Sequence, residues 1–519
     1  MGHKLAFDFG TTNSLVAHWD DHQADLVHLD ELSLPADPIV PSLVYMGAAL
    51  HDAPMGAQVI AAGLHQQADH RLFRNFKRGI VVRPAPAPRY LDNQLWSDKA
   101  IGSAFIQRVL ASVPFPKDAI DEIVLTVPVI AFQDYLDWLR QAVQEGVNGL
   151  PIEKIRVVDE STAAALGYAV TEPDALVLVF DFGGGTLDVS LVQLPKDKAS
   201  TGGWLNRLRR GGDAPTAKMI AKSGGALGGS DVDRWLAHHI LNELGLDEGS
   251  EGYQSLLTAC ENAKIALSNT ESALLQFTLA GVVYERQLTR VDLEAVLHQN
   301  GFDAAVSRVI ERTLYTARQQ EIFAEHLKDV LMVGGMALMP SVQAILRRYL
   351  PNATLHTGKV FTAIVEGALQ IAVGSGIDDT LVHSYGLRHL ENGQHRYDEI
   401  LPAGLKIPTT HPVELILGAA HEQQTGIELV IGEIDPEQSA GVTINLQGGE
   451  LVAMAEDLAV APLNHDQPTQ IPLDPVGKLG AERIKAAFSV DADRQLLVTV
   501  TDMERRKTLL KDHRLGLVR

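Results

Sequence analysis

The chain has 519 residues, of which 46% are hydrophobic and 21% charged, and its formal net charge is -21. This length predicts two to four domains, and the composition is typical of a globular chain. The acidic balance argues against nucleic-acid binding, which needs a basic face, and the single cysteine, Cys260, excludes an intrachain disulfide and a cysteine zinc site. The longest apolar runs have strand length, so we predict a cytoplasmic protein without a membrane span.

Strands and helices alternate up to about residue 375, which is the pattern of an α/β domain. Short apolar runs predict buried strands at Ile123–Val127, Leu176–Phe180 and Val330–Val333. Helical spacing predicts helices at Gln133–Gly146, Val232–Leu244 and Tyr253–Leu267. The stretch Pro195–Ala217, rich in glycine and arginine, is expected to form an exposed loop.

The pattern changes from about residue 384, where short strands recur between turn residues. The expected strands are Ile427–Ile431, Val442–Leu446, Arg483–Val490 and Gln495–Thr501. This spacing predicts a β-sandwich over residues 384–519. The small and polar segment 376–383 is predicted to link it to an α/β domain at residues 1–375.

Two segments of the α/β domain repeat one motif, in which a strand ends in Asp and continues through a glycine turn into another strand. The first is Asp8–Ser14 and the second is Asp181–Ser190, which contains three consecutive glycines. Such turns present N–H and hydroxyl donors to phosphate oxygens, and the Asp can hold Mg²⁺ or its waters. Two equivalent hairpins predict a duplicated domain that holds a polyphosphate from both sides.

A third glycine turn, Gly334-Gly335, follows the predicted strand Val330–Val333 and precedes a predicted helix at Pro340–Leu346. Its position lets the backbone pass close to a nucleoside, although a lone turn of this kind is a common connection between a strand and a helix.

The three turns resemble the phosphate-1, phosphate-2 and adenosine motifs of the actin-like ATPase superfamily. Within it, four segments resemble the seventy-kilodalton heat-shock (DnaK-type) chaperones, rather than actin or sugar kinases: Gly10–Ser14, Asp159–Ala165, Leu227–Asp231 and Ala259–Lys264. Leu405–Thr409 and Ala481–Gly516 resemble strands of that family's peptide-binding β-domain. The resemblance implies an actin-like ATPase domain of two ribonuclease-H-like halves, followed by a β-sandwich.

The resemblance also implies ligands and roles, namely binding of ATP or ADP and slow, Mg²⁺-dependent hydrolysis of ATP. Asp8 and Asp181 would hold the Mg²⁺ through its water shell. The implied catalytic residues are Lys77, Glu160, Thr186 and Asp188. The implied nucleotide-binding residues are Gly10, Thr11, Thr12, Asn13, Gly183, Gly184, Gly185, Gly228, Gly229, Glu261, Lys264, Ser268, Gly334 and Gly335.

The chain departs from the family where adenine binds. The family stacks adenine between two arginines, and these positions hold Ile265 and Leu338 here. Apolar side chains can still contact a purine, but a cation–π contribution of about 1 kcal/mol from each arginine is lost. We therefore predict weaker or less selective adenine binding than in a typical member.

The elements that couple the two domains in this family are partly present. Pro128 and Arg140 match its proline switch, and Arg156 matches an arginine that J-domain co-chaperones contact, while a nucleotide exchange factor is a further implied partner. The family's leucine-rich linker is replaced by Gly376–Val382, which predicts weakened coupling between ATP and peptide.

The resemblance implies a chaperone for unfolded or extended polypeptide, active in protein folding and stress response. Because the sequence ends soon after the β-domain, a helical lid is not expected and peptide release should be fast. The candidate groove residues are Leu415, Leu417, Ile427 and Leu429, although alternate apolar residues of a sandwich more often belong to its core. The alternatives are an actin-like assembly protein and a weakly coupled, nucleotide-gated scaffold that holds one dedicated protein partner.

Overall fold

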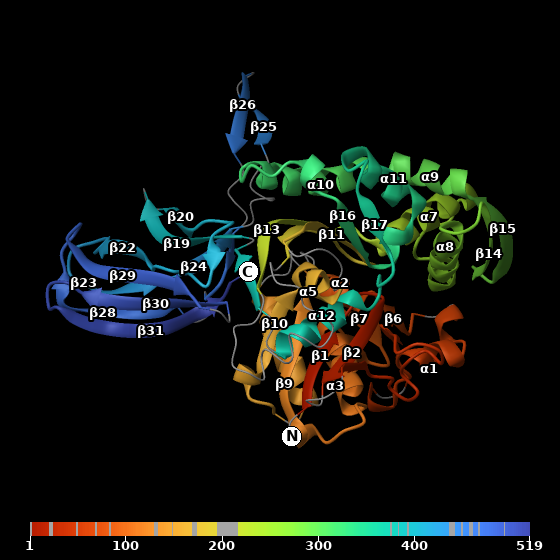
Figure 1. The fold of residues 1–519 in the computed structure, drawn as a ribbon, viewed down its shortest axis with the longest axis horizontal. Helices are drawn as coiled ribbons and strands as arrows, with labels where there is room; N and C mark the ends of the chain where they lie inside the picture. The colour runs from red at the N-terminus through yellow and green to blue at the C-terminus, as the bar shows by residue number, and fades with distance from the viewer. Residues whose placement is uncertain are drawn as a thin grey trace. The chain divides into compact units, whose positions relative to one another are not determined.

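The computed structural model of the chain has two compact units, Met1–Ile377 and Asp378–Arg519 (Figure 1). The first unit is mixed α/β, and the regular elements described in the second unit are all strands. The structure describes residues 3–19, 24–47, 50–67, 70–81, 85–128, 133–147, 149–168, 174–194, 216–373, 376–381, 383–391, 394–434, 442–447, 450–455, 460–464, 468–491 and 494–518.

One sheet of the first unit is built around an antiparallel hairpin of β1 (His3–Asp8) and β2 (Asn13–Trp19). Its strand order is β10-β9-β1-β2-β3, with β4 also on β2, and β9 and β10 run parallel to β1. The remaining strands are β3 (Ala24–Leu26), β4 (Val40–Pro41), β9 (Ile120–Val127) and β10 (Ile155–Asp159). The turn between β1 and β2 therefore lies at the carboxyl end of the parallel strands, the edge at which such sheets bind ligands.

The second sheet of this unit repeats the arrangement of the first. Its hairpin is formed by β11 (Leu176–Phe182) and β12 (Leu187–Gln193), and the order within the unit is β17-β16-β11-β12-β13. The outer strands are β13 (Thr216–Gly225), β16 (Asp329–Val333) and β17 (Thr354–His356). Since β16 and β17 are parallel to β11 and β13 is antiparallel to β12, the two sheets share strand order and direction.

Helices and small hairpins surround these sheets (Figure 1). The helices are α1 (Ala57–Ala61), α2 (Phe76–Val81), α3 (Asp98–Ala111), α4 (Gln133–Gly146), α5 (Glu160–Gly167), α7 (Gly229–Leu244), α8 (Tyr253–Leu267), α9 (Arg290–Gln299), α10 (Phe302–Arg318), α11 (Pro340–Tyr349) and α12 (Ala363–Ala372). The hairpins are β5 (Leu43–Tyr45) with β6 (Leu72–Arg74), β7 (Arg89–Leu91) with β8 (Gln94–Trp96), and β14 (Ser272–Leu279) with β15 (Val282–Thr289).

Helices α5 and α12 cross at two glycines, Gly167 and Gly367. A Cβ atom on Gly167 would overlap the carbonyl oxygen of Ala363, and a Cβ atom on Gly367 would overlap that of Ala163. Only glycine permits so close an approach of two backbones. Residues of both helices and both sheets form one core, which includes Ala6, Val124, Ala164, Val179, Leu331 and Ala368.

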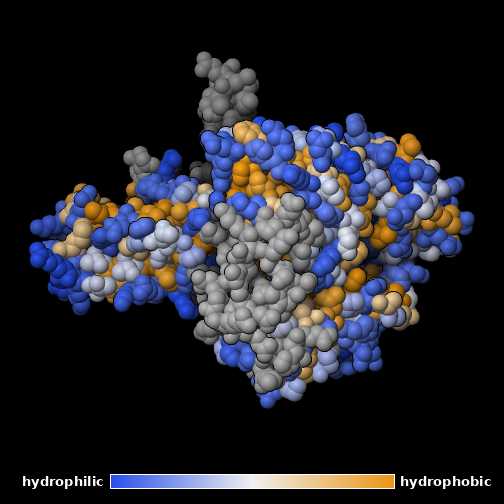
Figure 2. All heavy atoms as spheres, in the orientation of Figure 1, coloured by the Kyte–Doolittle hydropathy of each residue, from blue (hydrophilic) through white to orange (hydrophobic). Residues whose placement is uncertain are grey.

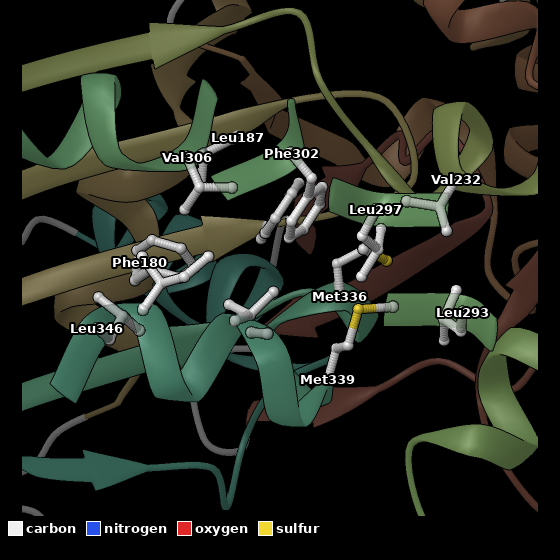
Figure 3. Packing of buried hydrophobic residues seen from close by; sticks show 14 of the residues in the cluster. Phe180, Leu187, Val232, Leu293, Leu297, Phe302, Val306, Met336, Met339 and Leu346 are labelled. Carbon is white, nitrogen blue, oxygen red and sulfur yellow. The ribbon is translucent and has the colours of Figure 1, made fainter. Parts of the chain in front are cut away.

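A larger core packs β11, β12 and β16 against α7–α11, and Figure 3 shows part of it. Phe182 and Phe302 stack at 5.9 Å between ring centroids, and Phe180 meets Phe182 edge-on. Met336 and Met339 lie within the same cluster (Figure 3) and are almost fully buried. Met336 lies within the short 3₁₀ segment η6 (Gly335–Leu338) and Met339 directly follows it, so this core anchors the glycine turn that follows β16.

The second unit contains two four-stranded sheets, ordered β20-β19-β24-β27 and β22-β29-β30-β31, with β23-β28 and β25-β26 as further pairs. A shared hydrophobic core joins strands of both sheets, for example Tyr385 and Ile431 with Phe488 and Val498. The strands are β18 (Gly376–Thr380), β19 (Ser384–Glu391), β20 (Gln394–Leu401), β21 (Lys406–Ile407), β22 (Val413–Gly418), β23 (Gln424–Leu429), β24 (Ile431–Ile434), β25 (Val442–Gln447), β26 (Glu450–Ala455), β27 (Val460–Pro462), β28 (Thr469–Gly477), β29 (Glu482–Val490), β30 (Gln495–Asp502) and β31 (Lys507–Leu517).

Large apolar residues are also found on the surface, and Figure 2 shows them interspersed with hydrophilic residues on the drawn face. They include Leu274, Val283 and Val291 in the first unit and Ile416 in the second. Scattered residues of this kind need no partner to explain them. Within the described part of the chain, no helix combines the length and the apolar character needed to cross a membrane.

The structure corrects two predictions of local structure. The single strand predicted at Ile427–Ile431 is split, because β23 ends at Leu429 and β24 begins at Ile431 with a different partner strand. The linker predicted at 376–383 is partly a strand, since the backbone of β18 pairs with β21 at Asp379 and Thr380. Most of the loop predicted at Pro195–Ala217 lies outside the described residues.

A buried ion pair stabilises the second unit. The guanidinium of Arg483 donates to Asp502 at 2.7 Å and to the carbonyl oxygen of Asp474 at 2.6 Å. Asp502→Ala removes this carboxylate and leaves Arg483 with the more exposed Glu504 carboxylate at 3.3 Å and two backbone carbonyl oxygens. The loss of the charged hydrogen bonds to Asp502 is expected to cost about 2 kcal/mol in the free energy of unfolding. Urea unfolding of the variant and the parent protein measures this loss.

The same pair predicts a pH dependence. Hydrogen bonds from Arg483 hold the pKa of Asp502 below its usual value. Because the pKa of Asp502 is lower in the folded than in the unfolded protein, the ion pair stabilises the folded protein at pH values above the unfolded pKa of about 4. This contribution disappears as the pH falls through the folded pKa.

The control for Asp502→Ala is Glu414→Ala, which removes an exposed pair with Lys485 at 2.8 Å and should cost about 0–1 kcal/mol in the free energy of unfolding. Equal losses for the two variants would contradict the prediction.

Candidate functional site

A cavity of about 250 Å³ in the first unit brings together residues from distant parts of the sequence. The turns after β1, β11 and β16 all line it, as do residues of α2, α5, α7 and α8. The residues that the sequence predicted for a nucleotide site and that line the cavity are Asp8, Gly10, Thr11, Thr12, Asn13, Lys77, Glu160, Asp181, Gly183, Gly184, Gly185, Thr186, Gly229, Glu261, Lys264, Ser268, Gly334 and Gly335.

The turn between β1 and β2 is closed by two serines. Ser14 Oγ accepts a hydrogen bond from the Gly10 N–H at 3.2 Å, and Ser42 Oγ donates to the Gly10 carbonyl oxygen at 2.8 Å. The two hydroxyls lie 3.0 Å apart. A Cβ atom on Gly10 would overlap the carbonyl oxygen of Asn13, so this tight turn requires glycine.

The turn between β11 and β12 lies against the first turn. A Cβ atom on Gly184 would overlap Thr12 Oγ1, and one on Gly185 would come within 2.5 Å of Thr11 Oγ1. The glycines therefore let the two hairpin turns approach each other from opposite sheets. This arrangement presents backbone N–H groups and threonine hydroxyls to one space, as a phosphate cradle requires.

The acidic end of the cavity contains a buried ion pair between Lys77 and Glu160. Lys77 Nζ lies 2.6 Å from Glu160 Oε1, and both side chains are less than 10% exposed. Glu160 is the first residue of α5, and Asp159 caps this helix by accepting the Thr162 N–H at 2.8 Å. Burial acts to lower the pKa of Lys77, but Glu160 and other nearby groups outweigh it and raise this pKa, so the side chain is a cation.

Two further carboxylates, Asp8 and Asp181, face this ion pair from the ends of β1 and β11. Thr126 Oγ1 donates to Asp8 Oδ1 at 2.6 Å. Burial, with the charge of Glu160, raises the pKa of Asp8 to about 6. Burial and the neighbouring carboxylates also raise the pKa of Asp181 well above its usual value. The site therefore concentrates negative charge that a cation would relieve.

These carboxylates fit the Mg²⁺ that the sequence predicts. Asp181 Oδ2 is buried without a hydrogen-bond partner among the described residues. Within those residues, no group of three acidic, histidine or cysteine side chains is arranged to ligate a metal directly. Since Mg²⁺ usually keeps several waters, Asp8 and Asp181 would hold it through its water shell.

The raised pKa of Asp8 predicts that this carboxylate destabilises the nucleotide-free protein. The pKa of Asp8 is higher in the folded than in the unfolded protein. The free energy of unfolding therefore falls as the pH rises from about 4 to about 6, and it stays lower at higher pH. Asp8→Asn is expected to stabilise the protein at pH 7.5 by on the order of 2–3 kcal/mol, with no difference at pH 4. Denaturant unfolding at both pH values tests this, with the exposed Asp118→Asn as control, and a destabilised Asp8→Asn at pH 7.5 would contradict it.

The other end of the cavity contains a network of ion pairs around α8. Lys264 Nζ lies 2.7 Å from Asp233 Oδ1 and donates to the Gly229 carbonyl oxygen at 3.0 Å. Glu261 forms an ion pair with Arg74, and Ser268 Oγ donates to the Lys264 carbonyl oxygen at 3.2 Å.

Three residues at this end, Asp233, Arg74 and Phe361, are not predicted from the sequence, and of these only Phe361 lines the cavity. Asp233 lies two residues after the predicted motif Leu227–Asp231, and Arg74 lies three before Lys77. These short separations are the only sequence signal that could have identified the two charged residues, and Phe361 has no comparable signal.

A comparison with known protein families adds an independent observation. The sequence model of the Hsp70 protein family matches residues 89–433, which is more than half of the chain. The chain is a member of the Hsp70 family. Membership implies the actin-like ATPase fold, and Hsp70 proteins are in general ATP-dependent chaperones that bind nucleotide with Mg²⁺. The match begins after Asp8 and Lys77, so the place of these two residues in the site rests on the geometry of the cavity.

Some predicted residues of this Hsp70-family chain lie outside the cavity lining. Asp188 is fully buried behind the turn, and Gly228 packs against the Gly184 carbonyl oxygen, where a Cβ atom would overlap it. Of the residues predicted to be allosteric, Pro128 and Arg140 are buried. Arg156 is part-exposed and forms an ion pair with Glu122 at 3.0 Å.

The four residues predicted for a peptide groove differ in exposure. Leu415 and Leu417 on β22 and Ile427 on β23 are half-buried at the margin of the core of the second unit. Leu429 has no exposed surface and belongs to that core, which places it away from any surface groove and corrects its prediction as a groove residue.

Proposed function

We propose that this chain binds and slowly hydrolyses ATP and uses the nucleotide to control binding of unfolded or extended polypeptide. The observation that carries the proposal is the meeting of two glycine hairpin turns, two acidic strand ends and the Lys77–Glu160 pair in one cavity. ATP provides the matching chemistry, because its triphosphate needs N–H donors and a cation.

The residues of the cavity suggest how hydrolysis proceeds. The turns after β1 and β11 bind the phosphates through backbone N–H groups and hydroxyls, including that of Thr186. Lys77 stabilises negative charge on the transferred phosphoryl group, and Glu160 orients the attacking water. Asp188 acts from behind the turn, where its charge adds to that of Asp181. Bound Mg²⁺ would neutralise phosphate charge. Phosphoryl transfer needs mainly such positioning and charge stabilisation and does not require a strong nucleophile on the protein.

We also propose that the first unit consists of two duplicated, ribonuclease-H-like halves. The identical order and direction of strands in the two sheets supports this. A second support is that α5 and α12, which follow β10 and β17, cross at Gly167 and Gly367 in a reciprocal contact.

For the second unit we propose a β-sandwich that binds polypeptide. The core shared by its two four-stranded sheets supports this architecture. Strand β22 ends the order of its sheet among the described strands, and an extended peptide can pair with such an edge. Leu415, Leu417 and Ile427 then provide apolar contacts for alternate peptide side chains.

The proposed partners beyond the peptide are a J-domain co-chaperone and a nucleotide exchange factor. The partial exposure of Arg156 is compatible with a contact to the first. Buried Pro128 and Arg140 are the proposed connection between nucleotide and peptide sites. Because the segment 376–383 lacks the leucine run of the family, we expect peptide release to respond only weakly to ATP.

Steady-state phosphate release with Mg²⁺ and ATP, measured with and without an unfolded peptide, tests the function. We expect slow hydrolysis that ends when Mg²⁺ is chelated, together with peptide binding detected by fluorescence anisotropy. Stimulation by peptide would demonstrate coupling, and a flat response would mean that the two activities are separate. Absence of ATP binding, or of peptide binding, would refute the proposed function.

A further inference from the structure

The end of the cavity away from Asp8 and Asp181 combines ion-paired residues of α8 with apolar side chains. The lining of this end includes three large apolar side chains: Ile265 on α8, Leu338 at the end of η6, and Phe361 in the segment before α12. Ile265 is 56% exposed and Phe361 is 37% exposed, so neighbouring protein covers neither side chain fully. Exposed apolar surface inside a cavity favours a ligand with an apolar part, because contact removes that surface from water.

The backbone fixes the position of Phe361. The residue before it, Val360, accepts a hydrogen bond through its carbonyl oxygen from the Gly334 N–H at 2.8 Å. Ring atoms of Phe361 lie 3.7 and 3.9 Å from the place where a Cβ atom on Gly335 would be. The ring therefore lies beside the glycine turn after β16, at ordinary van der Waals distance from the place of a Cβ atom on Gly335.

The charged residues near this end already have partners. Lys264 is engaged by Asp233 and the Gly229 carbonyl oxygen, and Glu261 by Arg74. A flat ligand group that enters here meets Ile265, Leu338 and Phe361 without displacing a buried ion pair.

We propose that Phe361 is the aromatic contact of the nucleobase and the main determinant of nucleotide affinity at this end of the cavity. The inference rests on the proposed ATP-binding function and extends it. The nucleobase is held by apolar and aromatic contact, which grows with the area of the base and depends little on its hydrogen-bonding groups. The site is thus selective for purine over pyrimidine nucleoside triphosphates and discriminates weakly between adenine and guanine.

Calorimetric titration of the full chain with Mg²⁺ and ATP, GTP, CTP or inorganic tripolyphosphate tests this. Phe361→Ala is expected to weaken ATP and GTP binding about five- to twentyfold, since one aromatic contact to a base has this size. Tripolyphosphate affinity should not change, because the phosphates contact other residues. The preference of the parent protein for ATP over CTP should largely disappear in the variant.

The matched control is Phe323→Ala, which removes a phenylalanine that is 44% exposed and lies outside the cavity lining. It should leave all four affinities unchanged. Phe361→Leu keeps an apolar side chain but loses the flat ring. The ATP and GTP affinities of Phe361→Leu should lie between those of the parent protein and those of Phe361→Ala. If Phe361→Ala does not fold, Phe361→Leu takes its place in the test.

The outcomes separate the inference from the proposed function. A parent protein that binds ATP, combined with a Phe361→Ala or Phe361→Leu variant that binds it equally well, overturns the inference alone. Equal weakening of ATP and tripolyphosphate also overturns it, because the substitution would then act through the phosphate turns. A parent protein that binds no nucleoside triphosphate refutes the proposed function and the inference together.

Discussion

Replacing Lys77 by methionine is expected to lower the rate of ATP hydrolysis about a hundredfold while ATP binding remains measurable. The Lys77 ammonium is buried beside Glu160 at 2.6 Å, and it is the cation that faces Asp8 and Asp181. Methionine keeps the length and apolar stem of the side chain but removes the charge. Single-turnover hydrolysis with bound ATP measures the chemical step separately from binding.

The control for this variant is Lys99→Met, since Lys99 is an exposed lysine of α3 whose nearest acidic group, on Asp134, is 3.7 Å away. It should hydrolyse ATP at the parent rate. The Lys77 variant should also unfold at lower denaturant concentration, because Glu160 loses its buried partner. Hydrolysis within about threefold of the parent rate would remove Lys77 from the proposed chemistry, because loss of a transition-state donor costs far more.

Replacing Gly367 by alanine is expected to destabilise the first unit by about 3 kcal/mol, which is the upper range for overpacking of a tight interior. The new methyl group would overlap the Ala163 carbonyl oxygen, and a helix backbone cannot yield as a flexible side chain can. Because α5 begins with Glu160 and α12 follows Phe361, a forced separation of the helices should also weaken ATP binding. Denaturant unfolding and nucleotide titration measure the two effects.

Gly358→Ala provides a matched control in the connection before α12, because a Cβ atom there has nothing within 4 Å. Its free energy of unfolding should stay within about 0.5 kcal/mol of the parent value. The reciprocal variant Gly167→Ala should behave like Gly367→Ala, since its methyl group would meet the Ala363 carbonyl oxygen. A stable Gly367→Ala protein would mean that α5 and α12 are less tightly packed than described.

The local sequence was sufficient where a few neighbouring residues determine the structure. Helices predicted at Gln133–Gly146 and Tyr253–Leu267 are confirmed with the same bounds as α4 and α8. The glycine turns after Asp8 and Asp181 were identified for the same reason, because strand, turn and strand lie in one short segment and glycine is required by the backbone itself. The resemblance carried by these segments also predicted the Hsp70 family, which the family comparison confirms.

Local sequence failed where a residue's environment comes from distant segments. Ile427 to Ile431 looked like one strand, yet partners from elsewhere in the chain divide it into β23 and β24. Leu429 has the same alternating pattern as Leu415 and Leu417, and only the packing of the sheets buries it completely. The alternation of side chains shows which residues share a face of a strand, and it does not show what covers that face.

The sequence by itself therefore determined the family, several of the helices and the three glycine turns of this chain, because each is encoded in short contiguous segments. Only the tertiary structure decided that these turns meet in one cavity, that Lys77 pairs with Glu160, and that Phe361 lies against Gly335. The physical reason is that burial and ion pairing depend on long-range packing. Residues far apart in the chain acquire their pKa values and contacts only after the sheets and the crossing helices have assembled.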